Sequence, residues 1–205
     1  MREWGPLSRA PGKGGILRRQ DAEVGSARES GVMKQIPWGE RRFEFPFPDG
    51  VYPELIERLR GTPARLADRL AKLPPDLLSR RPSRGWSMQE HCGHLGDLDK
   101  ELFLRRLEEY AQGAKALTAA DMENRLTEEA RHNERPFAAV LAGVREARQA
   151  VIARLERFEA VDFARVAIHP RLGCPMRLVD LLFFQAEHDD YHLARISGLL
   201  ASAWR

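Results

Sequence analysis

Two histidines near the end of the chain have the spacing of a metal site. His188 and His192 are four residues apart, and on a helix this spacing places both imidazoles on one face, one turn apart. A helix offers two nitrogen ligands to a metal ion in this way. The pair therefore indicates metal binding, and the alternative is two core histidines that hydrogen-bond to neighbouring carboxylates.

The residues around the pair place it on the inward face of a helix. At about 100° per residue, six positions lie within roughly 60° of one line. These positions are Leu181, Phe184, His188, His192, Ile196 and Leu199. Because a buried imidazole without a partner costs about 1–3 kcal/mol, the two rings need a metal ion or hydrogen-bond partners.

A third histidine lies on a separate predicted helix. Ser87 and Glu90 have the spacing of a capping box, so we expect a helix over about residues 87–110. His94 lies about two turns into it, beside the apolar stripe, where it could face a partner helix. Asp97, one turn later, could orient the His94 ring, serve as a fourth ligand or remain a solvated carboxylate.

The order and spacing of these motifs resemble the DinB/YfiT superfamily of bacterial four-helix proteins. The matching segments are Gly85-Trp86-Ser87, His94-Leu95-x-Asp97 and His188-x-x-x-His192-Leu193-Ala194-x-Ile196, together with residues 36–44 and His169-Pro170. The resemblance covers about residues 36–200. It implies an all-α fold, a four-helix bundle arranged up-down-down-up, in which three histidines hold a divalent metal, commonly zinc or nickel.

The resemblance also implies a class of activity. By motif position the metal ligands would be His94, His188 and His192. The family includes S-transferases and isomerases that use mycothiol or bacillithiol, and many members carry only the general description of metal-dependent hydrolases. We therefore expect a small-molecule substrate and a thiol-dependent S-transferase or a hydrolase. The alternative is a non-catalytic, stress-associated protein that binds a metal or a ligand, and in either case we expect a homodimer.

Three neutral histidines predict an open metal site. They leave coordination positions for water or substrate, as in catalytic rather than structural zinc sites. Such a metal lowers the pKa of a bound water toward 7, or binds and activates the thiolate of a small-molecule thiol. Weaker candidates for a catalytic role are Asp97, Glu187, Arg195 and His169.

Each of these candidates has a second interpretation. Arg195 could contact an anionic group or extend to the surface as a solvated arginine. Glu187 and Asp190 could act as general bases or form a solvated helix edge. His169 could line the mouth of the pocket, and His91 competes with His94 as the ligand from its helix.

For two further residues we predict positions without a catalytic role. His132 lies at an expected helix junction, where we predict that it is exposed. Trp86 precedes the helix start, and an aromatic residue there usually packs as a hydrophobic staple, so we predict a core position.

Composition limits the class of protein. The 205 residues, 43% hydrophobic and 31% charged, predict one domain with a substantial core. No segment has the length of a membrane span or the apolar run of a signal peptide, and we expect a cytoplasmic protein. Cys92 and Cys174 form no disulfide framework; Cys92 is expected in the core, and Cys174 in a turn near the pocket.

The charge distribution argues against nucleic acid as a partner. The net charge of the chain is +3. Residues 1–32 hold six basic and four acidic groups, so they account for +2 of this charge. This segment is rich in Gly, Arg and Ser without periodicity, so we expect a disordered extension. The bundle domain, residues 33–205, is nearly neutral, and no direct binding to nucleic acid or membrane is expected.

The rest of the chain predicts the elements that must position the histidines. Thr62 and Pro63 interrupt the first helix, with Thr62 as a candidate cap. The expected elements are a kinked helix or two helices over residues 52–73, a weak helix over 119–130, a long helix over 137–158, an extended crossover or short hairpin over 161–175, and a last helix that opens near Asp180.

Overall fold

Four helical segments make up most of the structure, a computed structural model that describes residues 35–203. They are α1 (Tyr52–Arg60) with α2 (Thr62–Leu70), α4 (Met88–Leu98) with α5 (Leu104–Ala111), α7 (Phe137–Leu155), and α8 (Leu178–Ala203). Shorter elements are η1 (Trp38–Glu40), η2 (Asp49–Val51), α3 (Pro75–Leu78), α6 (Arg125–Glu129), η4 (His132–Glu134) and η5 (Ala160–Ala164). The predicted extension, residues 1–32, lies outside the described residues.

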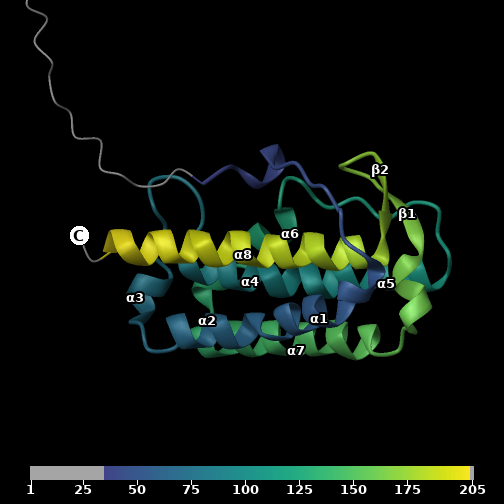
Figure 1. Ribbon diagram of the computed structural model, residues 1–205. Coiled ribbons are helices and arrows are strands. Elements are labelled where there is room, and N and C mark those ends of the chain that lie inside the picture. Colours follow the sequence, from purple (N-terminus) through teal and green to yellow (C-terminus); the bar gives the residue numbers. More distant parts are fainter. Residues whose placement is uncertain (1–34, 204–205) are drawn as a thin grey trace, which may run out of the picture. The chain divides into compact units, whose positions relative to one another are not determined.

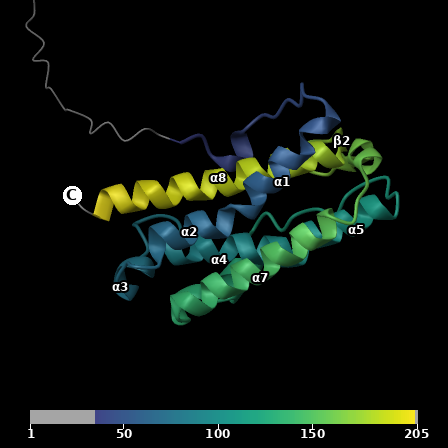
Figure 2. The ribbon, with the colours of Figure 1, turned by 60° about the horizontal axis from the view of Figure 1, so that its bottom comes forward.

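The helices form the expected bundle with up-down-down-up directions (Figures 1 and 2). The segment of α4 and α5 runs opposite to that of α1 and α2, α7 runs in the same direction as α4, and α8 returns. A long connection, residues 112–136, carries the chain back along the bundle so that α7 can start at the same end as α4. Helix α4 packs against both α7 and α8, so one of its faces lies against the last helix.

The first helix is interrupted at Gly61, so it is two helices in series. Pro63 lies in the first turn of α2, as predicted. The prediction of a cap at Thr62 is wrong, because its side chain makes no capping hydrogen bond. Thr62 is instead fully buried, and its hydroxyl donates to Asp189 Oδ2 at 2.7 Å. The Thr62 hydroxyl therefore bonds across a helix–helix contact instead of capping its own helix.

The capping box at Ser87 forms as predicted. The Ser87 hydroxyl accepts from the backbone N–H of Glu90 at 3.1 Å, and the Glu90 carboxylate accepts from the Ser87 N–H at 2.9 Å. The helix that starts here continues to Ala111, but Asp99–Phe103 (η3) is a π-helix. A π segment widens the turn, which changes the face that later residues present.

A short hairpin leads into the last helix. Strand β1 (Val166–His169) pairs antiparallel with β2 (Cys174–Arg177), with His169 opposite Cys174. Gly173 has a φ of +64°, a left-handed conformation that glycine adopts without steric cost. The hairpin therefore reverses direction over four residues and carries His169 against the bundle.

A buried ionic network connects the helices beside the histidines. Arg148 of α7, only 2% exposed, donates to Asp99 Oδ2 and to Asp189 Oδ2, each at 2.6 Å, and to the Leu59 carbonyl at 2.8 Å. Burial opposes the charge of Arg148, but the two carboxylates more than offset this and raise its pKa. Since Asp189 follows His188 directly, the network fixes the part of α8 that carries the histidines.

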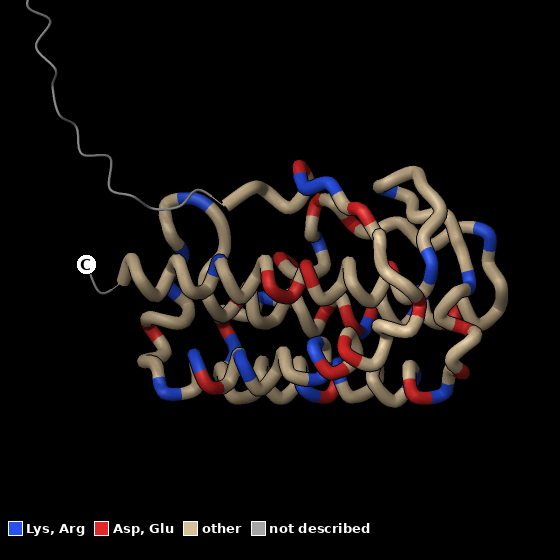
Figure 3. The backbone as a smooth tube through the Cα atoms, viewed as in Figure 1, with Lys and Arg blue, Asp and Glu red and all other residues tan. Residues whose placement is uncertain are grey.

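Charged residues of both signs are mixed along the bundle. In Figure 3, basic and acidic positions are interspersed among uncharged ones along the bundle. Within the described residues, none of the helices combines the length and apolarity needed to cross a membrane.

Candidate metal centre

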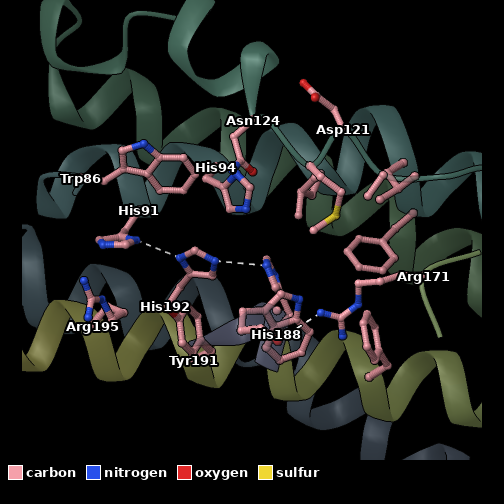
Figure 4. Close-up of a pocket in the computed structure, with 18 of the residues that line it drawn as sticks. Trp86, His91, His94, Asp121, Asn124, Arg171, His188, Tyr191, His192 and Arg195 are labelled. Atoms are coloured by element: carbon pink, nitrogen blue, oxygen red, sulfur yellow. Dashed lines mark hydrogen bonds between the residues drawn. The ribbon is translucent and has the colours of Figure 1, made fainter. Parts of the chain in front are cut away.

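The bundle brings together the three histidines that the motifs single out. His94 comes from α4, and His188 and His192 come from α8 (Figure 4). One ring nitrogen of each lies within 4.8 Å of the others, and all three side chains are buried. Among the described residues, this is the cluster of ligand-type side chains whose geometry could hold a metal ion.

The distances suit a divalent ion. The Nε2 atoms of His188 and His192 are 3.1 Å apart. Two histidine nitrogens that bind zinc at about 2.0–2.1 Å in a tetrahedral site lie about 3.3 Å from each other. The two rings on α8 therefore need only a small adjustment to share one ion, with His94 as the third donor.

Hydrogen bonds on the far side of two rings leave their Nε2 atoms on the side where a metal ion could bind. His192 Nδ1 lies 2.8 Å from His91 Nδ1, and His94 Nδ1 lies 2.9 Å from the Thr127 hydroxyl. With Nε2 facing the metal, each Nδ1 carries the proton and donates it, which holds the ring in the required orientation. His91 thus contacts a candidate ligand rather than replacing His94.

Asp97 orients His94 through an intermediate residue. The Thr127 hydroxyl donates to Asp97 Oδ2 at 3.2 Å, and His132 Nε2 lies 2.8 Å from the same oxygen. The prediction that His132 is exposed is wrong, because it is 3% exposed and packs against Gly93. A Cβ at position 93 would collide with the imidazole of His132, so only glycine allows this approach.

A pocket of about 330 Å³ opens beside the histidines. Its apolar wall consists of Leu98, Leu102, Phe103, Ala120, Met122 and Phe184, with Trp38, Trp86 and Tyr191 also lining it. The prediction of a core position for Trp86 is wrong: the side chain is half-buried, its ring lies 4.7 Å from that of His94, and its indole N–H donates to Glu128.

The weaker candidates lie in different places. Arg195 and His169 line the pocket, at opposite ends of the histidine cluster. Glu187 and Asp190 do not line it, because both carboxylates pair with Arg58 on the other side of α8. Both carboxylates therefore face Arg58 rather than the pocket.

The two cysteines also lie apart from the cluster. Cys92 is completely buried in the core, as predicted, and burial raises the pKa of its thiol to about 12. Cys174 is in β2 rather than in a turn, and it does not line the pocket, but it lies opposite His169, which does.

Comparison with known proteins identifies the family. The model of the DinB superfamily matches residues 58–196, which include all three histidines. The chain belongs to the DinB superfamily. Among curated proteins, no sequence matches it.

Two solved structures share the DinB fold with this chain. The first is YfiT from Bacillus subtilis, described as a probable metal-dependent hydrolase with an unusual four-helix bundle topology. It has 21% identity and a TM-score of 0.68 over 80% of this chain and 94% of that one. The second is a mycothiol-dependent maleylpyruvate isomerase, with 11% identity and a TM-score of 0.58 over 72% of this chain and 60% of that one. At these identities the comparisons establish the fold.

Local sequence patterns do not indicate several residues that either support His94 and Asp97 or line the pocket. Thr127 and His132 come from the long connection, and Arg106 and Arg171 come from α5 and the hairpin. Gly93 is a sequence signal that could have indicated a close neighbour, but a glycine does not identify the residue, here His132, that approaches it.

Thr127→Val is expected to weaken metal binding by about 10–100-fold. Valine has the shape of threonine, but it removes the hydroxyl between His94 and Asp97, so the His94 ring loses its orienting partner. Zinc affinity, measured by competition with a fluorescent chelator, checks this, with Thr127→Ser as the control that keeps the hydroxyl. Equal affinity of the valine variant and wild type would show that the contact is not needed.

Chelator-treated protein is expected to lose stability as the pH falls from 7.5 to 6. Burial lowers the pKa of His188 to about 3 and that of His91 and His169 to about 4, and it lowers the pKa of His94 and His192 as well. The unfolded chain then binds more protons than the folded one, so the free energy of unfolding decreases as the pH falls below about 6.5.

The expected loss at pH 6 is about 0.8 kcal/mol for each such histidine and about 2–4 kcal/mol in total. Urea unfolding at several pH values measures it. His188→Gln, which removes one titrating ring, should have a shallower pH dependence. A free energy of unfolding that stays constant over this range would contradict the burial of neutral histidines.

Proposed function

We propose that this protein is a metal-dependent S-transferase that joins a low-molecular-weight thiol, through its sulfur atom, to a small-molecule electrophile. The observation that carries the proposal is the convergence of His94, His188 and His192 beside an open pocket. Zinc or nickel is the proposed ion, because imidazole nitrogens suit both metals.

The donor set supports a catalytic rather than a structural metal. Three histidines are the protein ligands of many catalytic zinc sites, and structural sites carry a fourth protein ligand. Asp97, the residue proposed as a fourth ligand, is engaged by Thr127 and His132 instead. A divalent ion held by the three rings would act as a Lewis acid that lowers the pKa of a bound thiol or water.

The surrounding side chains supply the other requirements of thiol chemistry. Trp38 and Trp86 contact the rings of His188 and His94, and these large apolar walls exclude water from the cluster. The pocket contains one carboxylate, Asp121, among the described residues. Asp121 accepts hydrogen bonds from the backbone N–H groups of Glu123 and Arg125. A thiol, with an ordinary pKa near about 8.5, needs less help from a base than water does.

The test compares metal-loaded and chelated protein. Conjugation of monochlorobimane with mycothiol, bacillithiol or cysteine is followed by fluorescence, with zinc or nickel added back after chelation. We expect the metal-loaded protein to conjugate the thiol faster than buffer alone does. This extra rate should disappear on chelation and return when metal is added back. A rate equal to that of buffer under all metal conditions would contradict the proposal.

Hydrolysis is the second candidate function. It is favoured by the same observation of three neutral histidines beside open space, because this arrangement also activates water. Hydrolysis of 4-nitrophenyl acetate by the zinc-loaded protein separates the two activities. If ester cleavage depends on metal and thiol conjugation does not occur, the protein is a hydrolase.

Assembly and location complete the proposal. We propose a homodimer in the cytoplasm, the assembly and location expected from the sequence. Sedimentation equilibrium of the full chain measures the assembly, and a monomer at micromolar concentration would contradict it.

A further inference from the structure

One end of the pocket carries an arginine with a free hydrogen-bonding edge. Arg171, at the tip of the hairpin, lines the pocket (Figure 4). Its Nη1 donates to the Trp38 carbonyl at 3.1 Å. Its Nε and Nη2 are buried and have no hydrogen-bond partner among the described residues. Leaving buried donors unpaired costs free energy, so this edge is suited to a ligand.

The free atoms define the shape of the missing partner. Nε–H and one N–H of Nη2 point in parallel from the same side of a guanidinium. This edge matches the two oxygens of a carboxylate in a bidentate pair. A hydroxyl or carbonyl group would satisfy only one of the two donors, whereas a carboxylate satisfies both.

Aromatic rings hold the guanidinium in place. The Arg171 Cζ lies 5.4 Å from the ring centre of Trp38, 5.2 Å from that of Phe184 and 5.9 Å from that of Phe43. Rings at this distance attract a cation and limit its side-chain freedom. Arg171 makes no ion pair with a carboxylate within the described part of the chain, so its charge has no counterion there.

The surrounding charge also favours an anion. Arg106, 2% exposed, lies next to His169 in the same end of the pocket, with Nη1 at 3.4 Å from His169 Nε2. Asp121, the pocket's carboxylate, points away from the histidines in Figure 4. Positive charge is therefore concentrated where the Arg171 edge is free.

We propose that Arg171 binds the carboxylate of a substrate with an apolar body, which extends along Phe184, Phe103 and Leu102 toward the three histidines. This inference names the substrate class of the site and rests on the proposed function for the reaction itself. The hairpin end selects the acid group, and the apolar wall accepts the rest of the molecule by burying hydrophobic surface.

The test uses zinc-free full-length protein, so that a carboxylate cannot be held by a metal ion. Calorimetry measures the binding of 3-phenylpropionate and 4-phenylbutyrate and of the matched primary amides. We expect both acids to bind at least about tenfold more tightly than their amides, because the amide lacks the charge and the second acceptor oxygen. Equal affinities, or no binding of either acid at millimolar concentration, would overturn the proposal.

Variants locate the effect. Arg171→Gln is expected to lower the affinity for the acids at least about tenfold and leave that for the amides unchanged. Arg171→Lys keeps the charge without the planar edge and should bind the acids more weakly than wild type. Arg42→Gln, which removes an exposed arginine outside this pocket, is the matched control and should bind like wild type.

The outcomes separate this inference from the proposed function. Wild-type affinity for the acids in both Arg171 variants would overturn the carboxylate site. Zinc content is measured on the same preparations. Zinc binding without preference for acids would refute only the carboxylate site, whereas preference for acids without zinc binding would refute only the metal-dependent function.

Discussion

Replacing any one of His94, His188 or His192 by alanine is expected to weaken zinc binding at least about 100-fold. Each replacement removes one of three nitrogen donors that lie within 4.8 Å of one another. The two remaining rings cannot hold the ion at neutral pH with comparable affinity. Zinc content after dialysis, measured by mass spectrometry, should fall from one equivalent to near zero, and thiol conjugation should fall with it.

Other histidines of the same pocket provide the controls. His169→Ala should keep its zinc, because His169 lies outside the cluster. His91→Ala should weaken binding only about 10–100-fold, since His91 orients His192 and is not itself a donor. If His91→Ala lost as much zinc as His94→Ala, the assignment of the third ligand would have to change.

Arg148→Met is expected to have the largest effect on stability, a loss of about 3–5 kcal/mol at pH 7. Methionine fills much of the space, but it leaves Asp99 and Asp189 as adjacent buried carboxylates without a cation. Urea unfolding of the metal-free protein measures the change. Arg154→Met on the same helix removes a half-exposed pair with Glu108 and should change the free energy of unfolding by less than about 1 kcal/mol.

The pH dependence of the Arg148 variant identifies the cause. Burial already raises the pKa of Asp99, and the neighbouring Asp189 adds to the rise while Arg148 opposes it. Without Arg148 the pKa of Asp99 increases further, so the folded variant binds a proton more tightly than the unfolded chain does. The variant's loss in free energy of unfolding, relative to wild type, should therefore become smaller as the pH falls from 7 to 5. Adding Asp99→Asn to the Arg148→Met variant should also recover stability. If neither the lower pH nor this second substitution reduces the loss of stability, lost packing is the cause instead.

The three histidines of the candidate site could be predicted because their signals are local. His188 and His192 are separated by one helical turn, and the Ser87 capping box sets where the helix of His94 begins. Hydrophobic periodicity then indicates which face of each helix is buried. The same local rules located the long helices to within a few residues, and with the order of the motifs they indicated the bundle; the weak helix expected over residues 119–130 is only the short α6.

Contacts between distant segments could not be predicted in this way. Thr127 lies 33 residues from His94 and His132 lies 35 residues from Asp97, in a connection with no regular periodicity. Thr62 shows the same limit, because its residue type predicted a cap and its burial against Asp189 decided otherwise. A side chain that can satisfy several partners takes the one that packing brings closest.

The sequence by itself determined the helices, their inward faces and the three histidines as candidates, because spacing along a helix fixes direction in space. The tertiary structure alone decided how the rings are oriented, that Trp86 lines the pocket, that Arg148 joins two carboxylates, and that Arg171 presents a free edge. These features depend on which side chains meet across the bundle, and no local pattern of residues encodes such a meeting.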